Sequence, residues 1–320
     1  MKLTLFFGIL LLCVTSSQSY LLFNDQFVQS MPFEPSDIDS SYGYFFFDAT
    51  QTNINNLLSG STLHQSVNPF TWTLPQGPTG ALDHVKVLQY HTQQFKPGLN
   101  KGILKYKFRG SAQSYNVLDH PFPSNLVSKP NDDLRLGSCA VNTVDFDTMM
   151  VADFFLTNEG LYAFYERLPF ARTPTNNYRS FSQAKRVSDR TAQEKHNLRI
   201  EYDINQRTLS WFVEQTRVLF VTLIGYPSND PKVRMMIDHG GENTLVQPTG
   251  FRAGWGCFTL LDALDYHNTT STKGLVRLNS EDGPDYNRPL SFHDDESLLS
   301  NRLWGQGAEI EVDSFRLENF

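Results

Sequence analysis

Short runs in which apolar and polar residues alternate follow one another along most of this chain. The pattern is clearest at 198–202, where Leu, Ile and Tyr alternate with Arg and Glu. A period of two places successive side chains on opposite faces of an extended segment, so such runs predict strands. Turn signals at 158–160 and 205–207 separate neighbouring runs. We expect strands at 102–109, 149–156, 161–168, 198–202, 208–213, 217–223, 251–261 and 308–317.

Many short strands without intervening helices are typical of an all-β fold, in which antiparallel sheets form a sandwich, a jelly roll or a barrel. No internal repeat or low-complexity linker divides the chain between 20 and 320, so we expect a single domain there. Its core is expected at about 40–265, together with the closing strand at about 308–317. Irregular extensions are expected at 20–80 and 263–300.

The first nineteen residues have the pattern of a secretory signal peptide. Lys2 precedes an apolar run at 3–14, and Ser17 and Ser19 stand where signal peptidase accepts small residues. The run is well short of the ~20 residues that a membrane-spanning helix needs, and no later stretch is longer. The pattern predicts a signal peptide at 1–19 and a secreted protein without a membrane span.

The charge balance argues against a nucleic-acid partner. The chain has 27 Lys and Arg against 34 Asp and Glu, a formal net charge of −7, whereas phosphate binding needs clustered basic residues. The sequence also lacks a Gly-x-Ser-x-Gly elbow, a phosphate-binding Gly-Lys-Ser/Thr loop and a dinucleotide-binding glycine fingerprint. These absences exclude the serine-esterase, NTPase and NAD-dependent classes.

Two features fit an oxidising compartment. Cys13 lies in the predicted signal peptide, which leaves Cys139 and Cys257 as a pair that we expect to form a disulfide, with two buried free thiols as the alternative. Two cysteines are too few for a structural zinc site made of thiolates. Asn268 begins the one glycosylation sequon, Asn-Thr-Thr, in a polar stretch, and we expect it to be glycosylated.

The segment 149–168 places two acids among aromatic residues. If 157–160 forms the turn of a hairpin, the register gives the pairs Leu156–Leu161, Phe155–Tyr162, Asp153–Phe164 and Val151–Glu166. Asp153 and Glu166 then become diagonal neighbours on one face, with Cα atoms ~7–8 Å apart. An apolar face excludes charge unless the charge is paired or in contact with water, so this pair is the main functional signal in the sequence.

Three interpretations of the two acids remain open. They have a spacing that suits a retaining glycosidase, whose carboxyl groups lie ~5 Å apart. They could equally bind sugar hydroxyls without catalysis. Alternatively, Arg135 or Arg167 neutralises one or both of them in a structural ion network.

Five segments resemble a family of functionally uncharacterised bacterial and fungal proteins. They are 83–90 (DHVKVLQY), 132–148 (DDLRLGSCAVNTVDFDT), 151–170 (VADFFLTNEGLYAFYERLPF), 196–203 (HNLRIEYD) and 254–264 (GWGCFTLLDAL). The resemblance covers roughly residues 40–265 and implies a concanavalin-A-like jelly-roll sandwich of two antiparallel sheets, without implying an activity. The signal peptide and the cysteine pair depart from the family's usual form, so the resemblance says nothing about secretion.

Other acidic motifs carry less weight. Glu309, Glu311 and Asp313 share one face of the closing strand and resemble the acidic triplet of laminarinase-type glycosidases, but their order differs and the position suits a jelly-roll closing strand. The acid-rich segments 281–285 and 294–296 offer oxygen atoms to calcium without EF-hand spacing, so solvated loops are expected there. The segment 238–242 (DHGGE) has one His and is weak support for a metal. No metal or other cofactor is expected.

The leading hypothesis is a secreted carbohydrate-binding jelly roll. In it, Asp153, Glu166, Arg135 and Tyr162 make polar contacts with a glycan, and Trp255 is exposed because its glycine neighbours let a flat ligand approach. One alternative is a glycoside hydrolase or lyase with Asp153 and Glu166 as catalytic acids. The other is a structural extracellular protein.

Overall fold

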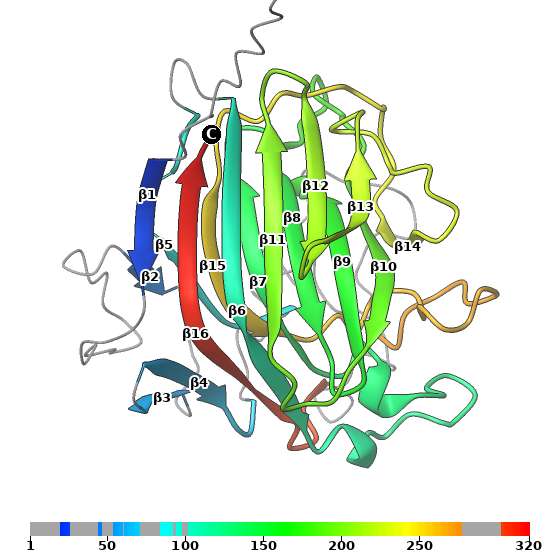
Figure 1. Ribbon diagram of the computed structural model, residues 1–320. Coiled ribbons are helices and arrows are strands. Elements are labelled where there is room, and N and C mark those ends of the chain that lie inside the picture. The colour runs from blue at the N-terminus through cyan, green and yellow to red at the C-terminus, as the bar shows by residue number, and fades with distance from the viewer. Residues whose placement is uncertain are drawn as a thin grey trace, which may run out of the picture.

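The computed structural model describes residues 20–25, 44–46, 54–59, 61–70, 84–91, 94–97, 102–276 and 302–320. Their regular structure consists of β-strands and a few short 3-10 helices: η2 (Val117–Asp119), η3 (Pro130–Asp132) and η4 (Pro169–Ala171). The strands form two antiparallel sheets that pack face to face (Figure 1). The predicted signal peptide, 1–19, lies outside the described residues.

Sheet A is the front layer in Figure 1. Its strands are β1 (Tyr20–Asp25), β3 (Ile54–Ser59), β4 (Thr62–Val67), β6 (Ile103–Tyr115), β11 (His196–Asp203), β12 (Thr208–Val213), β13 (Thr216–Val221) and β16 (Gly307–Asn319). Their order is β13-β12-β11-β6-β16-β4-β3, and β1 pairs with β16. The closing strand therefore lies beside β6, in the middle of its sheet.

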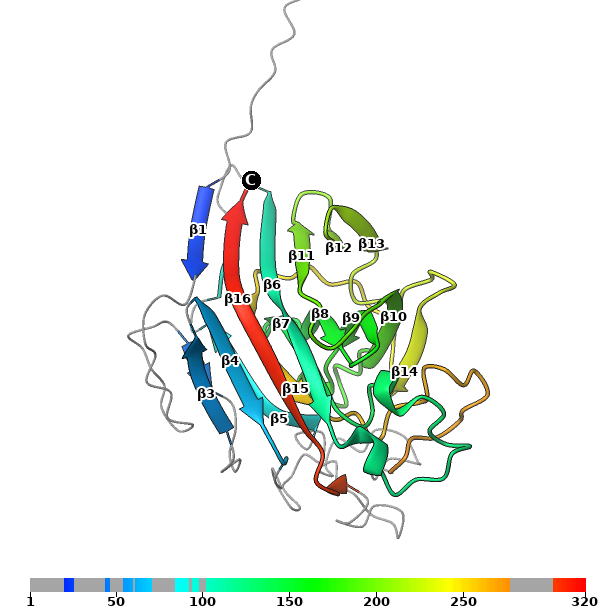
Figure 2. The ribbon, with the colours of Figure 1, turned by 60° about the horizontal axis from the view of Figure 1, so that its bottom comes forward.

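Sheet B lies behind sheet A, and the turned view of Figure 2 shows the two layers more nearly edge-on. Its strands are β2 (Tyr44–Phe46), β5 (Val85–His91), β7 (Ser138–Asp145), β8 (Met150–Leu156), β9 (Gly160–Arg167), β10 (Phe181–Asp189), β14 (Arg234–Asp238) and β15 (Arg252–Phe258). Their order is β14-β10-β9-β8-β7-β15-β5-β2.

The main hydrophobic core fills the space between the sheets. Trp211 of β12 and Trp255 of β15 are both 0% exposed within it. The indole Nε1 of Trp211 donates a hydrogen bond of 3.0 Å to the carbonyl oxygen of Asp153, which links the two sheets. Burying a large apolar side chain contributes roughly 1.5–3 kcal/mol, so these rings are major sources of stability.

A second apolar cluster covers the outer face of sheet B. Phe155, Tyr162, Phe164 and Phe258 belong to it, and loops that follow η3 and β15 lie over them. Every residue of β7 and β8 is consequently buried. A strand buried on both faces loses its alternation, and β7 was not predicted. β8 is buried in the same way but was predicted beside the turn signal at 158–160.

The predicted fold class, an all-β jelly-roll sandwich of two antiparallel sheets, is confirmed. The predicted strands at 149–156, 161–168 and 308–317 correspond to β8, β9 and β16. The predicted strand at 251–261 is shorter, because β15 ends at Phe258 and a turn follows. In addition to β7, the sequence pattern did not predict β2, β5, β10 and β14 of sheet B. It also did not predict β1, β3 and β4 of sheet A, which lie in the segment 20–80 that was expected to be irregular.

The predicted disulfide between Cys139 and Cys257 is present. The two residues are directly opposite in the register of β7 and β15. Asn268 lies exposed in the loop after β15, so its glycosylation stays a prediction. The described part of the chain contains no helix that is long and apolar enough to cross a membrane.

Candidate functional site

A cavity of about 500 Å³ lies on the outer face of sheet B. Its walls come from β5, β7, β8, β9 and β10 and from the chain around the ends of β14 and β15. Most of the lining is apolar or aromatic, and the polar lining residues are His84, Asn142, Asp153, Glu166, Arg167, Ser180, Ser182 and His239. Phe146 and Phe170 also line it and are 40% and 49% exposed. The cavity therefore meets the surface of the described part beside these two rings.

The β8–β9 hairpin has the register that the sequence predicted. Phe155 faces Tyr162, Asp153 faces Phe164 and Val151 faces Glu166. The turn is closed by a 2.9 Å hydrogen bond from the N–H of Thr157 to the carbonyl oxygen of Gly160. Asp153 and Glu166 thus lie on the same face, and both line the cavity.

Asp153 is 2% exposed and is held by neutral donors. The side-chain Nδ2 of Asn142, directly opposite on β7, donates to Asp153 Oδ2 over 2.6 Å, and the N–H of Thr143 donates to Oδ1 over 2.9 Å. Burial raises the pKa of Asp153 well above its usual range, the charge of Glu166 raises it further, and the two hydrogen bonds oppose this. Burial therefore favours the protonated form of Asp153.

Glu166 is partly exposed to the cavity. Its partner in the register of β10 is Ser182, whose hydroxyl is hydrogen-bonded to it. Burial raises the pKa of Glu166 to about 7, although Ser182 and the nearby His84 lower it. Glu166 therefore changes charge near neutral pH.

A histidine–aspartate pair forms another polar part of the site. His84 Nε2 contacts Asp262 Oδ1, and the charge of His84 lowers the pKa of Asp262 although burial opposes this. His239, which follows β14, also lines the cavity. Burial lowers the pKa of His239, so this ring is neutral at pH 7.

The sequence analysis did not assign His84, Asn142 or Asp262 to the site. Each lies in a segment that carried the family resemblance, at 83–90, 132–148 and 254–264. Asn142 had a usable signal, because it is a polar residue in an apolar run. Its meaning became clear only when the register placed it opposite Asp153.

Aromatic rings make up much of the remaining wall. Tyr90 and Phe146 meet edge to face with ring centroids 6.0 Å apart. Phe155 lies 5.3 Å from Phe258 between centroids, at a tilted angle. The cavity therefore combines rings with a buried acid–amide group.

Trp255 is not at the cavity, and the expectation that it is exposed was wrong. Its side chain is 0% exposed in the core between the sheets. Alternation along β15 turns the flanking glycines the other way, and they make room for the neighbouring strand rather than for a ligand. A Cβ atom on Gly254 would lie 1.7 Å from the carbonyl oxygen of Gln89, and one on Gly256 2.3 Å from that of Val87.

Arg135 is a structural residue rather than part of the cavity wall. It is 2% exposed, and its Nη2 lies 2.6 Å from Asp133 Oδ2 and 3.4 Å from Asp265 Oδ2. These contacts join the loop after η3 to the loop after β15. The predicted ligand contact of Arg135 is therefore not supported by its position, because its donors are used within the protein.

Tyr162 has a similar role. Its hydroxyl donates over 2.8 Å to Asp132 Oδ1, and the Nε of Arg186 lies 2.8 Å from Asp132 Oδ2. The ring is 0% exposed. Tyr162 therefore fixes the loop over sheet B and does not reach the cavity.

The predicted ion network around the two acids is also wrong in its partners. Within the described ranges, no Lys or Arg forms an ion pair with Asp153 or Glu166. Arg167 donates to Thr244 Oγ1 over 2.6 Å and lies 3.9 Å from the centre of the Tyr178 ring. Burial raises the pKa of both acids, and among the described residues no arginine pairs with them.

Of the remaining acidic motifs, only the segment 238–242 reaches the cavity, through His239; the others lie elsewhere on the described part or outside the described residues. Glu309, Glu311 and Asp313 project from β16 on the outer face of sheet A. Asp238 in the segment 238–242 forms an ion pair of 2.6 Å with Arg179. The segments 281–285 and 294–296 lie outside the described residues.

Comparisons with known proteins give a family and a type of fold. A family model described as "Family of unknown function (DUF6081)" matches residues 49–319. An uncharacterized protein, L829, of Acanthamoeba polyphaga mimivirus is 27% identical over 297 residues, which cover 75% of this chain and 65% of that protein. The chain thus spans about two thirds of its relative. The sequence motifs predicted an uncharacterised family, whereas the bacterial and fungal origin stays an expectation.

Among solved structures, the fold is similar to an endo-1,3-beta-glucanase from Streptomyces sioyaensis, with 10% identity, coverage of 95% and 97% of the two chains and a TM-score of 0.44. It is also similar to LamAcat from Zobellia galactanivorans, with 10% identity, coverage of 93% and 96% and a TM-score of 0.44. Scores of this size carry no information on the ligand or activity of this chain.

Proposed function

The chain belongs to the DUF6081 family of unknown function, and we propose that it binds a carbohydrate of one or two sugar units in the cavity on sheet B. The observation that carries the proposal is the pairing of aromatic rings with an acid–amide group in one cavity. A sugar ring has apolar C–H faces and a polar rim of hydroxyls. Rings such as Tyr90 and Phe155 pack against the faces, and Asn142, Asp153 and Glu166 bond the hydroxyls.

The polar group has unused hydrogen-bonding capacity. Asn142 is 3% exposed, and its Oδ1 has no hydrogen-bond partner among the described residues. A buried amide oxygen without a partner costs ~1–3 kcal/mol, so a hydroxyl that donates to it gains that amount on binding. Asp153 accepts hydrogen bonds through its carboxyl oxygens, and in its protonated form, which burial favours, it also donates one. The volume of about 500 Å³ falls in the range of ~300–1,000 Å³ that is usual for small-molecule sites.

The test is a glycan array, followed by calorimetric titration of the best oligosaccharide into wild type, Asn142→Ala and Glu166→Gln. We expect each substitution to weaken binding at least ~10-fold, the equivalent of one lost hydrogen bond in a buried site. Glu201→Gln is the matched control, because Glu201 is paired with Lys105 and Arg199 on the other sheet. If both cavity variants are folded, as judged by thermal unfolding, and bind the oligosaccharide with unchanged affinity, the cavity is not the carbohydrate site.

Catalysis is the second candidate, and the raised pKa values of the two acids favour it. Burial raises the pKa of Glu166 to about 7, and burial together with the charge of Glu166 raises the pKa of Asp153 well above its usual range. One acid can then donate a proton to a leaving group while the other acts as base or nucleophile, as in a glycoside hydrolase or lyase. Release of reducing ends from the bound glycan should disappear in Asp153→Asn and Glu166→Gln while binding persists in Asp153→Asn. Turnover that survives in both variants would exclude this candidate.

We also propose that the protein is secreted. The disulfide between Cys139 and Cys257 is of the kind that persists in oxidising compartments, and Asn268 is exposed where a glycan would need it to be. Expression of the full chain in a eukaryotic cell should deliver protein without residues 1–19 to the medium, and Asn268→Gln should lower its mass by one glycan. Retention of the uncleaved chain inside the cell would contradict the proposal.

A further inference from the structure

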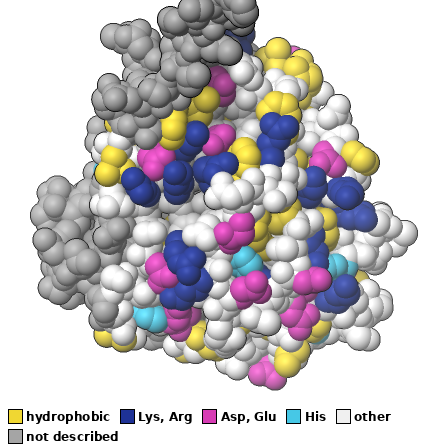
Figure 3. Space-filling view, in the orientation of Figure 1, with side chains coloured by type: hydrophobic (Ala, Val, Ile, Leu, Met, Phe, Trp, Pro, Cys, Tyr) yellow, Lys and Arg dark blue, Asp and Glu magenta, His cyan; other side chains and the backbone are white. Residues whose placement is uncertain are grey.

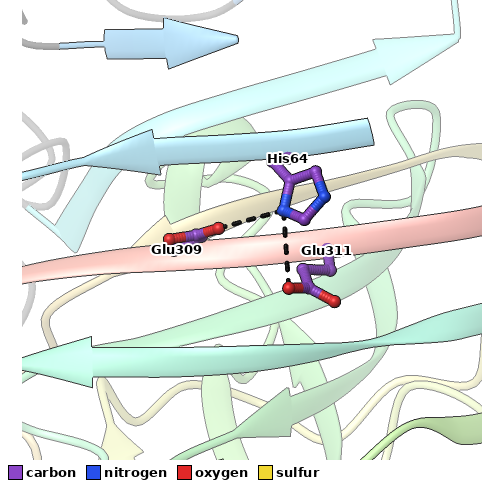
Figure 4. A group of neighbouring side chains, drawn as sticks. All are labelled: His64, Glu309 and Glu311. Carbon is purple, nitrogen blue, oxygen red and sulfur yellow. Dashed lines mark hydrogen bonds and ion pairs between the residues drawn. The ribbon is translucent and has the colours of Figure 1, made fainter. Parts of the chain in front are cut away.

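The outer face of sheet A, opposite the cavity, carries a histidine between two glutamates. Alternation along β16 places Ile310 in the core and turns Glu309 and Glu311 outward. β4 runs antiparallel to β16, and the register sets His64 directly opposite Glu311 and diagonal to Glu309. Figure 4 shows the imidazole ring between the two carboxylates. The pairing of strands 245 residues apart thus brings together one nitrogen and two carboxylate ligands.

The spacing of these atoms is that of ligands around one metal ion. His64 Nδ1 lies 3.2 Å from Glu309 Oε1 and 3.4 Å from Glu311 Oε1. Ligands in a tetrahedron with metal–ligand bonds of about 2.0–2.1 Å lie about 3.3 Å from one another. The three atoms all lie within 4.8 Å of one another. All three residues are partly exposed, so an ion can enter and water can complete its coordination.

Neighbouring hydroxyls orient the two carboxylates. Tyr115 Oη donates to Glu309 Oε2 over 2.8 Å, and Ser111 Oγ donates to Glu311 Oε2 over 3.3 Å. Both bonds engage the oxygen that faces away from His64, which leaves each Oε1 directed at the ring. Outer hydrogen bonds of this kind fix the ligands of protein metal sites.

In the described part of the chain, a lysine approaches Glu311, whereas no Lys or Arg pairs with Glu309. Figure 3 shows acidic and basic side chains interspersed over this face. Lys195 lies 2.7 Å from Asp313, the next acid along the strand, and 3.4 Å from Glu311 Oε2. Glu309 has no Lys or Arg partner in the part of the chain that the structure describes, and its contacts there are with His64 and Tyr115. Its negative charge is therefore left for a bound ion.

We propose that His64, Glu309 and Glu311 bind a divalent first-row transition-metal ion such as Zn²⁺. One imidazole nitrogen and two carboxylate oxygens suit Zn²⁺, because this ion accepts both ligand types in four-coordinate sites and takes water in the remaining position. The ion would link β4 to β16 and so strengthen the attachment of the β3–β4 hairpin to the centre of sheet A. The site is on the other sheet from the cavity, so it stands or fails independently of carbohydrate binding.

The experiment is a calorimetric titration of ZnCl₂ into the full chain after treatment with a chelator. We expect one saturable equivalent in wild type, and at least a ~10-fold loss of affinity in His64→Ala and in Glu309→Gln. Glu318→Gln is the matched control: it lies on the same strand, and Glu318 is paired with Lys107 at 2.7 Å. It should bind Zn²⁺ as wild type does.

A second measurement separates this site from other histidines of the chain. Replacement of Zn²⁺ by Co²⁺ gives visible absorption bands whose intensity reports tetrahedral coordination. These bands should appear in wild type and in Glu318→Gln and disappear in His64→Ala. If wild type shows no saturable binding of Zn²⁺, or if His64→Ala binds it with unchanged affinity and spectrum, the proposal is overturned.

Discussion

Replacing Glu166 by glutamine should change how the stability of the protein depends on pH. Glu166 lies on β9 at the cavity, where burial raises its pKa from 4.5 to about 7. Between these two values the folded state holds a proton that the unfolded chain has released. The contribution of Glu166 to the free energy of unfolding is therefore greatest below about pH 4.5 and is lost as the pH rises from there through 7. Glutamine has no proton to lose, so Glu166→Gln removes this dependence.

The size of the effect follows from the change in proton affinity. A rise in pKa from 4.5 to about 7 corresponds to about 3 kcal/mol, since each tenfold change in affinity is about 1.4 kcal/mol. Asp153 adds to it, because its own pKa is raised partly by the charge of Glu166. The free energy of unfolding of Glu166→Gln minus that of wild type should therefore be about 3 kcal/mol larger at pH 8 than at pH 4.

The assay is urea unfolding of wild type and Glu166→Gln at half-unit steps from pH 4 to 8. Titrating groups that do not interact with Glu166 are shared by the two proteins and cancel in the difference. Glu201→Gln serves as the control, and its difference from wild type should not show this rise. A flat difference between wild type and Glu166→Gln across the whole range would refute the conclusion that the cavity raises the pKa of Glu166.

Four further predictions concern the framework of the site. Trp255→Ala should lower the free energy of unfolding by ~3–5 kcal/mol without a direct effect on the cavity, because the ring fills the main core; a loss below 1 kcal/mol in urea unfolding would contradict its burial. The double variant Cys139→Ala and Cys257→Ala should cost about 4 kcal/mol, because the disulfide closes a loop across 118 residues, and reduction of wild type should give a similar loss. Gly254→Ala should cost more than about 1 kcal/mol, because its Cβ meets the backbone of the neighbouring strand; a fully stable variant would show that the strands can move apart. Arg135→Ala should cost ~3–5 kcal/mol in urea unfolding, because two buried carboxylates lose their cation; a loss below 1 kcal/mol would contradict this role.

The part of the site that could be predicted is local. The turn at 157–160 and the alternation on either side of it fixed the register of the β8–β9 hairpin, and with it the shared face of Asp153 and Glu166. A two-residue period leaves little freedom once the turn is identified, because a slip by one residue would invert every side chain. Alternation over a few residues likewise predicted the strand at 308–317, which corresponds to β16.

Other site residues could not be predicted because they come from distant segments. His84 and Asn142 join Asp153 only through the order of strands β5, β15, β7 and β8 in sheet B. The direction of Trp255 depended on which face of β15 meets the opposite sheet. The Gly-Trp-Gly sequence is compatible with either direction, since glycines serve a close ligand and a close strand equally well.

The sequence by itself determined the all-β class and the hairpin that carries the two acids, because period and turn chemistry act over a few residues. Only the tertiary structure decided that the outer face of sheet B is covered by the loops after η3 and β15, and that the acids therefore line a partly closed cavity. It also decided that His64 meets Glu309 and Glu311 across two strands. The burial of a side chain and its distance to other side chains depend on contacts between residues far apart in the chain. These contacts set the pKa values and the chemistry of both sites.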